Sequence, residues 1–257
     1  MAQLSATILT LNEARHIRQC IESLRDLADE IIVVDSLSTD GTPDICRELG
    51  CSVTRRRMAG YGAQRQYATS LTTHDYVLAL DADEVISPAL RSTLIELKKN
   101  GFRHRGYSFP RLNFYCGTPV KHCGWYPDIQ VRLFDKRYAN WNLHDVAERV
   151  IFRDNVRPHL LDGDILHYRC DTPAEYRLTE ENHARYLAGR IAAENPSIGS
   201  LRPLWEGIKS FVDCYIAQGG IFDGIAGRDI SVERFRSSRD AYRLAREIMT
   251  ERKEKDQ

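Results

Sequence analysis

The chain has 257 residues, 42% of them hydrophobic, which is enough to bury one sizeable core and too few for three ordinary domains. Lysine plus arginine and aspartate plus glutamate both number 36, and this zero net charge argues against a protein that coats nucleic acid. Because it lacks a long apolar run and a secretory leader, we expect a chain that neither spans a membrane nor is exported.

The first hundred residues alternate short apolar runs with helical patterns. Strands are predicted over 4–10, 30–35, 51–54 and 76–80, and helices over 12–24, 42–49, 64–71 and 88–100. Strands that are apolar throughout are typical of a parallel sheet covered on both faces, in which ligands bind at the carboxyl ends of the strands. Since Thr10, Asp35 and Asp81 each end a predicted strand, we expect them to meet in one crevice.

Beyond residue 106 the pattern changes twice. Aromatic and β-branched runs from 107 to about 168 predict mixed β structure that completes the same domain. Helices then follow, beginning with the capping sequence Thr172-Pro173-Ala174-Glu175 and ending with a helix from about Ser231. We therefore predict one α/β domain over 1–170 and a helical extension over 171–257.

The second helix of the extension carries an apolar stripe flanked by Arg202 and Lys209. This composition is typical of a helix that lies in a membrane interface, and it equally suits packing on the catalytic domain or on a second subunit. Both interpretations stay open, as does the oligomeric state. The stripe comprises Leu204, Trp205, Ile208, Phe211, Val212, Tyr215 and Ile216.

The segment Asp81-Ala82-Asp83 places two carboxylates side by side at the end of an apolar strand. Their mutual repulsion favours a divalent cation such as Mg²⁺ or Mn²⁺ between them, although a solvated turn before a helix is the alternative. The longer run to Val85 also fits the Asp-x-Asp-x-Val motif of aspartate-nucleophile phosphatases, which makes a metal-dependent phosphohydrolase a second hypothesis.

Three segments follow predicted strands: Ile8-Leu9-Thr10-Leu11-Asn12-Glu13, Val33-Val34-Asp35-Ser36-Leu37-Ser38-Thr39-Asp40-Gly41-Thr42 and Leu80-Asp81-Ala82-Asp83-Glu84. In this order and spacing they resemble the family 2 nucleotide-sugar glycosyltransferases of GT-A fold, over roughly the first 170 residues. The resemblance implies that residues 1–170 are a catalytic domain with a nucleotide-binding half (1–100) and an acceptor-side half (101–170). The resemblance implies a GT-A (Rossmann-like) α/β fold, with a mixed sheet flanked by helices and, here, a helical C-terminal extension. It also implies a nucleotide-sugar donor, with uridine favoured over guanosine, and a divalent metal on the diphosphate.

The resemblance also implies roles for individual residues. Asp35 would contact the nucleobase, Asp81 would lie near the ribose and Asp83 would bind the metal. His167 would complete the metal shell, although a lone histidine in a strand is usually structural. Further donor contacts are expected from Thr10, Asn12, Glu13 and Gln64 or Arg65, the last of which could instead be a solvated helix residue.

An acceptor hydroxyl needs a general base. Our first candidate is Asp128, because Trp125 and Tyr126 before it would form a sugar-stacking wall and partly desolvate the acid. Relatives often carry Glu-Asp here, whereas this chain has Pro127 before Asp128; the alternative base is Asp145.

A serine after the first acid, as in Asp35-Ser36, is familiar among bacterial lipopolysaccharide-core sugar transferases, whereas Leu37 stands where glycine is usual. We therefore predict an inverting transferase acting on a glycolipid or core-oligosaccharide acceptor at the inner face of the cell membrane. An odd count of seven cysteines without a Cys-x-x-Cys pair agrees with the reducing cytoplasm. A third hypothesis is a non-catalytic nucleotide-binding module.

Overall fold

A computed structural model describes residues 2–143, 148–195 and 197–255 of the chain. The chain forms two compact units. The first comprises Met1–Arg111 and Asp128–His167, and the second comprises Leu112–Pro127 and Tyr168–Gln257. The segment 112–127, which the sequence pattern assigned to the first domain, thus groups with the C-terminal helices.

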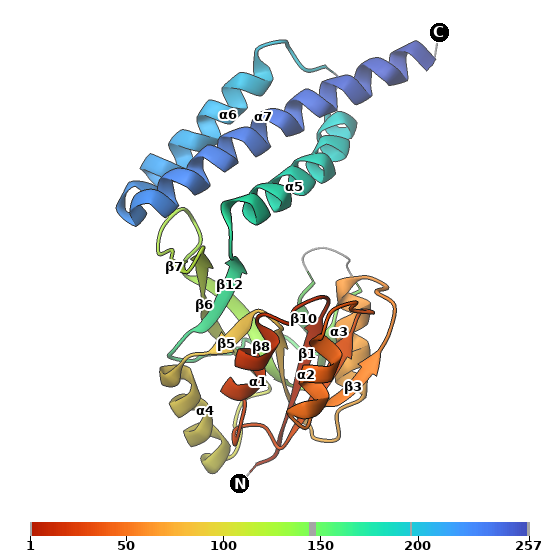
Figure 1. Cartoon of the computed structure of the whole chain (residues 1–257), viewed down its shortest axis with the longest axis vertical. Coiled ribbons are helices and arrows are strands. Elements are labelled where there is room, and N and C mark those ends of the chain that lie inside the picture. The colour runs from red at the N-terminus through yellow and green to blue at the C-terminus, as the bar shows by residue number, and fades with distance from the viewer. Residues whose placement is uncertain (1, 144–147, 196, 256–257) are drawn as a thin grey trace. The chain divides into compact units, whose positions relative to one another are not determined.

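Four parallel strands begin the sheet of the first unit (Figure 1). They lie in the order β3 (Ser52–Arg55), β2 (Glu30–Asp35), β1 (Leu4–Thr10) and β4 (Tyr76–Asp81). In this register Thr10 lies opposite Asp35, and Leu9 lies opposite Asp81. The carboxyl ends of β1, β2 and β4 therefore meet at one edge of the sheet, as the sequence predicted.

The remaining strands make the sheet mixed. β8 (Asp128–Asp135) runs antiparallel to β4 and to β6 (Gly106–Tyr115), and β12 (Ile165–Cys170) lies antiparallel to β5 (Glu84–Ile86). The expected mixed sheet is therefore confirmed. The shorter strands are β7 (Thr118–Pro119) and β11 (His159–Leu160), which pair with β6, and β9 (Ala139–Trp141) and β10 (Val150–Phe152), which pair with each other.

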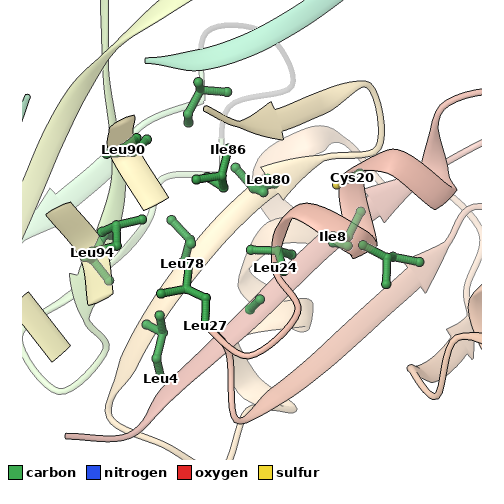
Figure 2. Packing of buried hydrophobic residues seen from close by; sticks show 14 of the residues in the cluster. Leu4, Ile8, Cys20, Leu24, Leu27, Leu78, Leu80, Ile86, Leu90 and Leu94 are labelled. Carbon is green, nitrogen blue, oxygen red and sulfur yellow. The ribbon is translucent and has the colours of Figure 1, made fainter. Parts of the chain in front are cut away.

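Helices cover both faces of the parallel strands. Figure 2 shows one face, where Leu78 and Leu80 of β4 pack with Leu24 and Leu27 after α1 and with Leu90 of α4. Each fully buried leucine stabilises the fold by about 1.5–3 kcal/mol, so this core holds the strands in register. The helices of the unit are α1 (Ile17–Ser23), α2 (Thr42–Glu48), α3 (Tyr61–Ser70) and α4 (Pro88–Asn100).

The second unit is built on α5 (Pro173–Glu194), α6 (Arg202–Val212) and α7 (Gly224–Lys255), with a π-helical turn at Asp213–Ala217 and a 3-10 turn at Gly220–Asp223. Thr172 caps α5 as predicted, because its side chain accepts a hydrogen bond from the Glu175 N–H at 3.2 Å. α7 begins at Gly224 rather than near Ser231, and Ala226 and Ile230 of this extra stretch are buried in the unit's core. Among the described residues, no helix is both long and apolar enough to cross a membrane.

Candidate active site

A cavity of about 380 Å³ opens at the carboxyl ends of β1 and β4 in the first unit. It collects residues that lie far apart in the sequence because parallel strands end at the same edge of the sheet. Asp35 does not line it directly, but the next residue, Ser36, does. The lining comprises Leu9, Thr10, Leu11, Glu13, Ser36, Met58, Tyr61, Asp81, Ala82, Asp83, Arg111 and His167.

Buried acceptor atoms without a partner mark the ends of β1 and β2. Within the described part of the chain, Thr10 Oγ1, Asp35 Oδ1 and Gln64 Oε1 make no hydrogen bond. The other Asp35 oxygen, Oδ2, accepts from the Ser38 N–H at 3.1 Å and from Arg55 Nε at 3.2 Å. An unsatisfied buried polar group costs about 1–3 kcal/mol, so this corner favours a ligand that brings N–H or O–H donors.

Asn12 joins the loops that follow β1 and β2. Its N–H donates to Ser38 Oγ at 2.8 Å, and its Oδ1 accepts from the Thr39 N–H at 2.8 Å, with a positive φ of 56°. The Asn12 amide oxygen is therefore engaged in holding the two loops together. Glu13, by contrast, lines the cavity, and its Oε2 lies 2.9 Å from His16 Nδ1.

The two acids of the Asp81-x-Asp83 motif have different surroundings. Asp81 accepts from Arg65 Nη2 at 2.7 and 2.9 Å and from Arg132 Nη2 at 3.0 Å. Burial alone would raise the pKa of the Asp81 carboxyl, but the attraction of Arg65 and Arg132 outweighs it and lowers that pKa well below its usual range. The charge of Asp81 is thus already matched by protein cations.

Arg65 is buried on α3, so the interpretation as a solvated helix residue is wrong. Its guanidinium bridges Asp81 to Glu148, whose Oε1 lies 3.1 Å from Arg65 Nε, and it stacks 4.6 Å above the Trp141 ring. Three partners on different elements leave it one orientation. Its neighbour Gln64 is also buried, and Nε2 donates to Ser36 Oγ at 3.2 Å and to the Arg56 carbonyl at 3.1 Å.

Glu84 is a site residue that the sequence analysis missed. It is fully buried, and it accepts from the Asp81 N–H at 2.9 Å, from Arg111 Nη1 at 2.9 Å and from Arg132 Nη2 at 3.0 Å. Because buried carboxylates need such partners, Glu84 ties the motif to strands β6 and β8. An arginine inside the apolar run Val131-Arg132-Leu133 was the available signal, since a buried arginine implies a buried acid.

Asp83 and His167 lie together in the cavity. The Asp83 Oδ2 is 3.3 Å from His167 Nε2, because β12 pairs with β5 and brings His167 opposite Glu84. The described residues contain no group of three or more His, Cys, Asp or Glu side chains that could hold a metal ion. One carboxylate and one imidazole nevertheless fit a divalent ion that takes its other ligands from substrate phosphates and water.

Asp128 begins β8, directly opposite Arg111 in the β6–β8 register. Arg111 Nε and Nη2 lie 2.8 and 2.7 Å from Asp128 Oδ2, and Gln130 Nε2 donates to its other oxygen at 2.6 Å. The prediction that Trp125 forms a sugar-stacking wall is wrong, because Trp125 is buried in the second unit, with its ring centroid 5.6 Å from that of Tyr176. The alternative base, Asp145, lies outside the described residues.

The loop after β2 adopts a turn that usually needs glycine. Leu37 has a φ of 69°, in the left-handed region, and its side chain is 44% exposed. This conformation costs a leucine about 1–2 kcal/mol. The Asn12 and Asp35 hydrogen bonds to Ser38 hold the loop in place across the strained residue.

Comparisons with known proteins identify the family of this chain. The family described as Glycosyl transferase family 2 matches residues 5–137, which include Asp35, the Asp81-x-Asp83 motif and Asp128. An uncharacterized glycosyltransferase of Rickettsia prowazekii is 33% identical over 247 residues, covering 88% of this chain and 81% of that protein. The lipopolysaccharide core biosynthesis glycosyltransferase LpsC of Rhizobium meliloti is 31% identical over 196 residues, covering 72% of this chain and 70% of LpsC.

Among solved structures, a similarity is found to glucosyl-3-phosphoglycerate synthase of Mycobacterium tuberculosis in complex with Mn²⁺, UDP and glucosyl-3-phosphoglycerate. The identity is 25%, the match covers 44% of each chain, and the TM-score is 0.36. At that TM-score the likeness carries no weight for the site.

Proposed function

The chain belongs to glycosyl transferase family 2 and is a glycosyltransferase, and from that premise we propose that it moves a sugar from a UDP-sugar to a hydroxyl group of a glycolipid or lipopolysaccharide-core acceptor, with inversion. Membership of the family sets aside both the phosphohydrolase and the non-catalytic module. The observation that carries the proposal is the pairing of Asp83 with His167 in a cavity lined by Thr10, whose Oγ1, like Asp35 Oδ1 on the neighbouring strand, makes no hydrogen bond within the described residues.

In the proposed site, Asp83 and His167 hold a divalent cation, Mg²⁺ or Mn²⁺. When bound, such an ion neutralises the diphosphate and makes it a better leaving group. Asp35 Oδ1 accepts a hydrogen bond from the imide N–H of uracil, and Gln64 Oε1 and Thr10 Oγ1 offer further acceptors to the nucleoside. Asp81 lies beside the ribose and orients it, while Arg65 and Arg132 match the charge of the Asp81 carboxylate.

Asp128 is the proposed general base. It takes the proton of the acceptor hydroxyl while the acceptor oxygen attacks the anomeric carbon and the bond from that carbon to the diphosphate oxygen breaks. Arg111 and Gln130 hold the two oxygens of Asp128, so the carboxylate is oriented before substrate binds. Arg111 also bonds to Glu84, which links the base to the metal-binding motif through one guanidinium.

The donor is tested by thermal unfolding with Mn²⁺ present. A ligand that binds only the folded chain stabilises it, by about 2.7 kcal/mol at a concentration one hundred times its Kd, and so raises its melting temperature. We expect UDP-sugars to raise the melting temperature and GDP-sugars to leave it unchanged. A shift with GDP-sugars alone would overturn the uridine assignment.

The base is tested by Asp128→Asn, which keeps the hydrogen bonds to Arg111 but cannot take a proton. We expect turnover to fall by about 10²–10⁴-fold, while UDP binding measured by calorimetry is retained. Asp162→Asn, at an exposed acid of the same unit, is the matched control and should keep full activity. Unchanged turnover of Asp128→Asn would remove the residue from the mechanism.

We further propose that the enzyme lies on the cytoplasmic face of the membrane through α6. Supporting this, Trp205 is 62% exposed and Phe222 in the following turn is 78% exposed, and Lys209 borders the same face. Aromatic and aliphatic side chains bordered by a cation suit a lipid interface. Between residues 201 and 225, the exposed large apolar side chains are Leu201, Leu204, Trp205, Ile208, Val212, Ile216, Ile221, Phe222 and Ile225.

Co-sedimentation with vesicles of phosphatidylcholine and phosphatidylglycerol tests this contact. Trp205→Glu should weaken partitioning by about tenfold or more, because an apolar contact is replaced by a charge. The control is Tyr186→Glu, an equally polarising change at a side chain of α5 that is 51% exposed. Equal loss in both variants, or a concentration-dependent dimer that Trp205→Glu dissociates, would favour the protein-packing alternative.

A further inference from the structure

Two cavities in the second unit differ in how their arginines are matched. The first, of about 280 Å³, lies between α5 and α7. Three of its four arginines are paired with acids, among them Arg177, which lies 3.1 Å from Glu233, and Arg243, which lies 3.3 Å from Glu247. The fourth, Arg185, donates to the Asn182 amide oxygen. A cavity whose cations are mostly neutralised has little attraction for an anion.

The second cavity, of about 310 Å³, is lined from β12, α5, α6 and α7. It contains Arg169 and Arg234, and neither guanidinium makes a hydrogen bond or ion pair with any residue that the structure describes. Arg234 is half-buried between helices, and Arg169 stacks 5.0 Å above the Trp125 ring, which limits its orientations. Unmatched positive charge in a partly enclosed space favours binding of an anion.

The other groups of this cavity agree with that charge. His183 and the hydroxyl groups of Ser210 and Ser238 add donors, and neither hydroxyl has a hydrogen-bond partner within the described ranges. The one acid of the cavity, Glu180, forms no ion pair with either arginine within the described residues; its charge, after burial, helps to raise the pKa of Tyr176. Two arginines and two serine hydroxyls around 310 Å³ suit a phosphate or carboxylate group rather than a neutral sugar alone.

We infer that this Arg169–Arg234 cavity is an anion site, which binds a phosphate or carboxylate group. Guanidinium groups recognise both anions through paired N–H donors, and a half-buried arginine loses least on binding when no acid competes for it. Anion binding by this cavity does not depend on the proposed transferase function.

Inorganic phosphate is the probe, titrated into the full chain by calorimetry without divalent metal and in the Asp83→Asn background. Those conditions silence the diphosphate site of the first unit, so failure of the transferase proposal leaves this test intact. We expect saturable binding that Arg234→Gln and Arg169→Gln each weaken by about tenfold, the loss expected for one charge-assisted contact. Arg190→Gln, at an α5 arginine paired with Glu194 and outside the cavity, should bind as the parent does.

Circular dichroism and Arg234→Lys guard against a folding defect, because lysine keeps the charge and should restore part of the affinity. Equal phosphate affinity in the parent and in Arg234→Gln, or no saturable binding by the parent, overturns the cavity as an anion site. Glucose 1-phosphate and anionic vesicles then compete with phosphate in separate arms. Competition by the sugar phosphate identifies a soluble phosphate ester as the ligand of the anion site, whereas competition by vesicles alone identifies a lipid headgroup.

Discussion

The two units each bury a glutamate between two arginines, and the two arrangements differ in where the arginines lie. Glu84 of the first unit is fully buried, and so, nearly, are its partners Arg111 and Arg132, with side chains 16% and 5% exposed. Glu233 of the second unit is equally hidden, but Arg177 and Arg236 are 52% and 44% exposed. Removing Glu84 would leave buried guanidinium groups without their shared acid. Removing Glu233 would leave guanidinium groups that water already solvates.

The charged residues of the first unit orient side chains of the site, whereas most of those in the second unit lie on its surface. In the first unit, Arg65, Arg111 and Arg132 are held by the acids of one network, which orients Asp81 and Asp128 beside the cavity. In the second unit, most ion pairs lie along exposed helix faces, where each is worth about 0–1 kcal/mol. Removing one partner of an ion pair should therefore cost most around the proposed active site, where the charges are buried.

The largest expected effect is on stability. Glu84→Gln should lower the free energy of unfolding by about 3–5 kcal/mol, because it leaves two buried guanidinium groups without their shared acid. Glu233→Gln should cost about 1 kcal/mol or less, since water solvates its partners. Urea unfolding of both variants measures the difference, and equal losses would break the comparison.

The next effect is on catalysis rather than on folding. Asp83→Asn should reduce transfer by about 10²–10³-fold, the loss typical when one stabilising group is removed from a transition state, with little change in the unfolding midpoint. Release of UDP in the presence of Mn²⁺ measures it. Retained transfer would show that the chemistry of the cavity does not depend on Asp83. The comparison between the two units would then concern stability alone.

Acid should weaken the first unit through Asp81. Its folded pKa lies below the ordinary value of about 3.9, so its ion pairs contribute stability above that pH, and the contribution is lost as pH falls through the folded pKa. Wild-type chain should lose up to about 1.4 kcal/mol per pH unit from this group below about pH 4. Asp81→Asn, although less stable throughout, should show a shallower slope in urea unfolding between about pH 5 and about pH 3. Parallel slopes would contradict the assignment.

The smallest effect concerns the strained loop of the first unit. Leu37→Gly should raise stability by about 0.5–1 kcal/mol, because relief of the left-handed conformation outweighs the extra flexibility of glycine in the unfolded chain. Thermal unfolding measures the gain. Leu160→Gly, at a similarly exposed leucine in strand β11, should instead destabilise the chain.

Much of this molecule could be predicted from local patterns. Apolar runs ending in Thr10, Asp35 and Asp81 predicted parallel strands with their polar ends at one edge, because strand period and length are properties of short segments. The cap at Thr172 was predicted for the same reason. The partner of each charged side chain was not, since Glu84 and Arg132 are 48 residues apart and meet only when β5, β8 and their neighbours pair.

The sequence by itself therefore determined the fold class, the family and the acids that end the strands, because each is encoded in contiguous residues. Only the tertiary structure decided that Arg65 and Arg132 match the charge of Asp81, that Trp125 is buried with Tyr176, and that Arg169 and Arg234 share a cavity in which neither is paired with an acid of the described residues. Burial and charge pairing depend on which elements pack together, and patterns in short stretches of sequence do not specify those tertiary contacts.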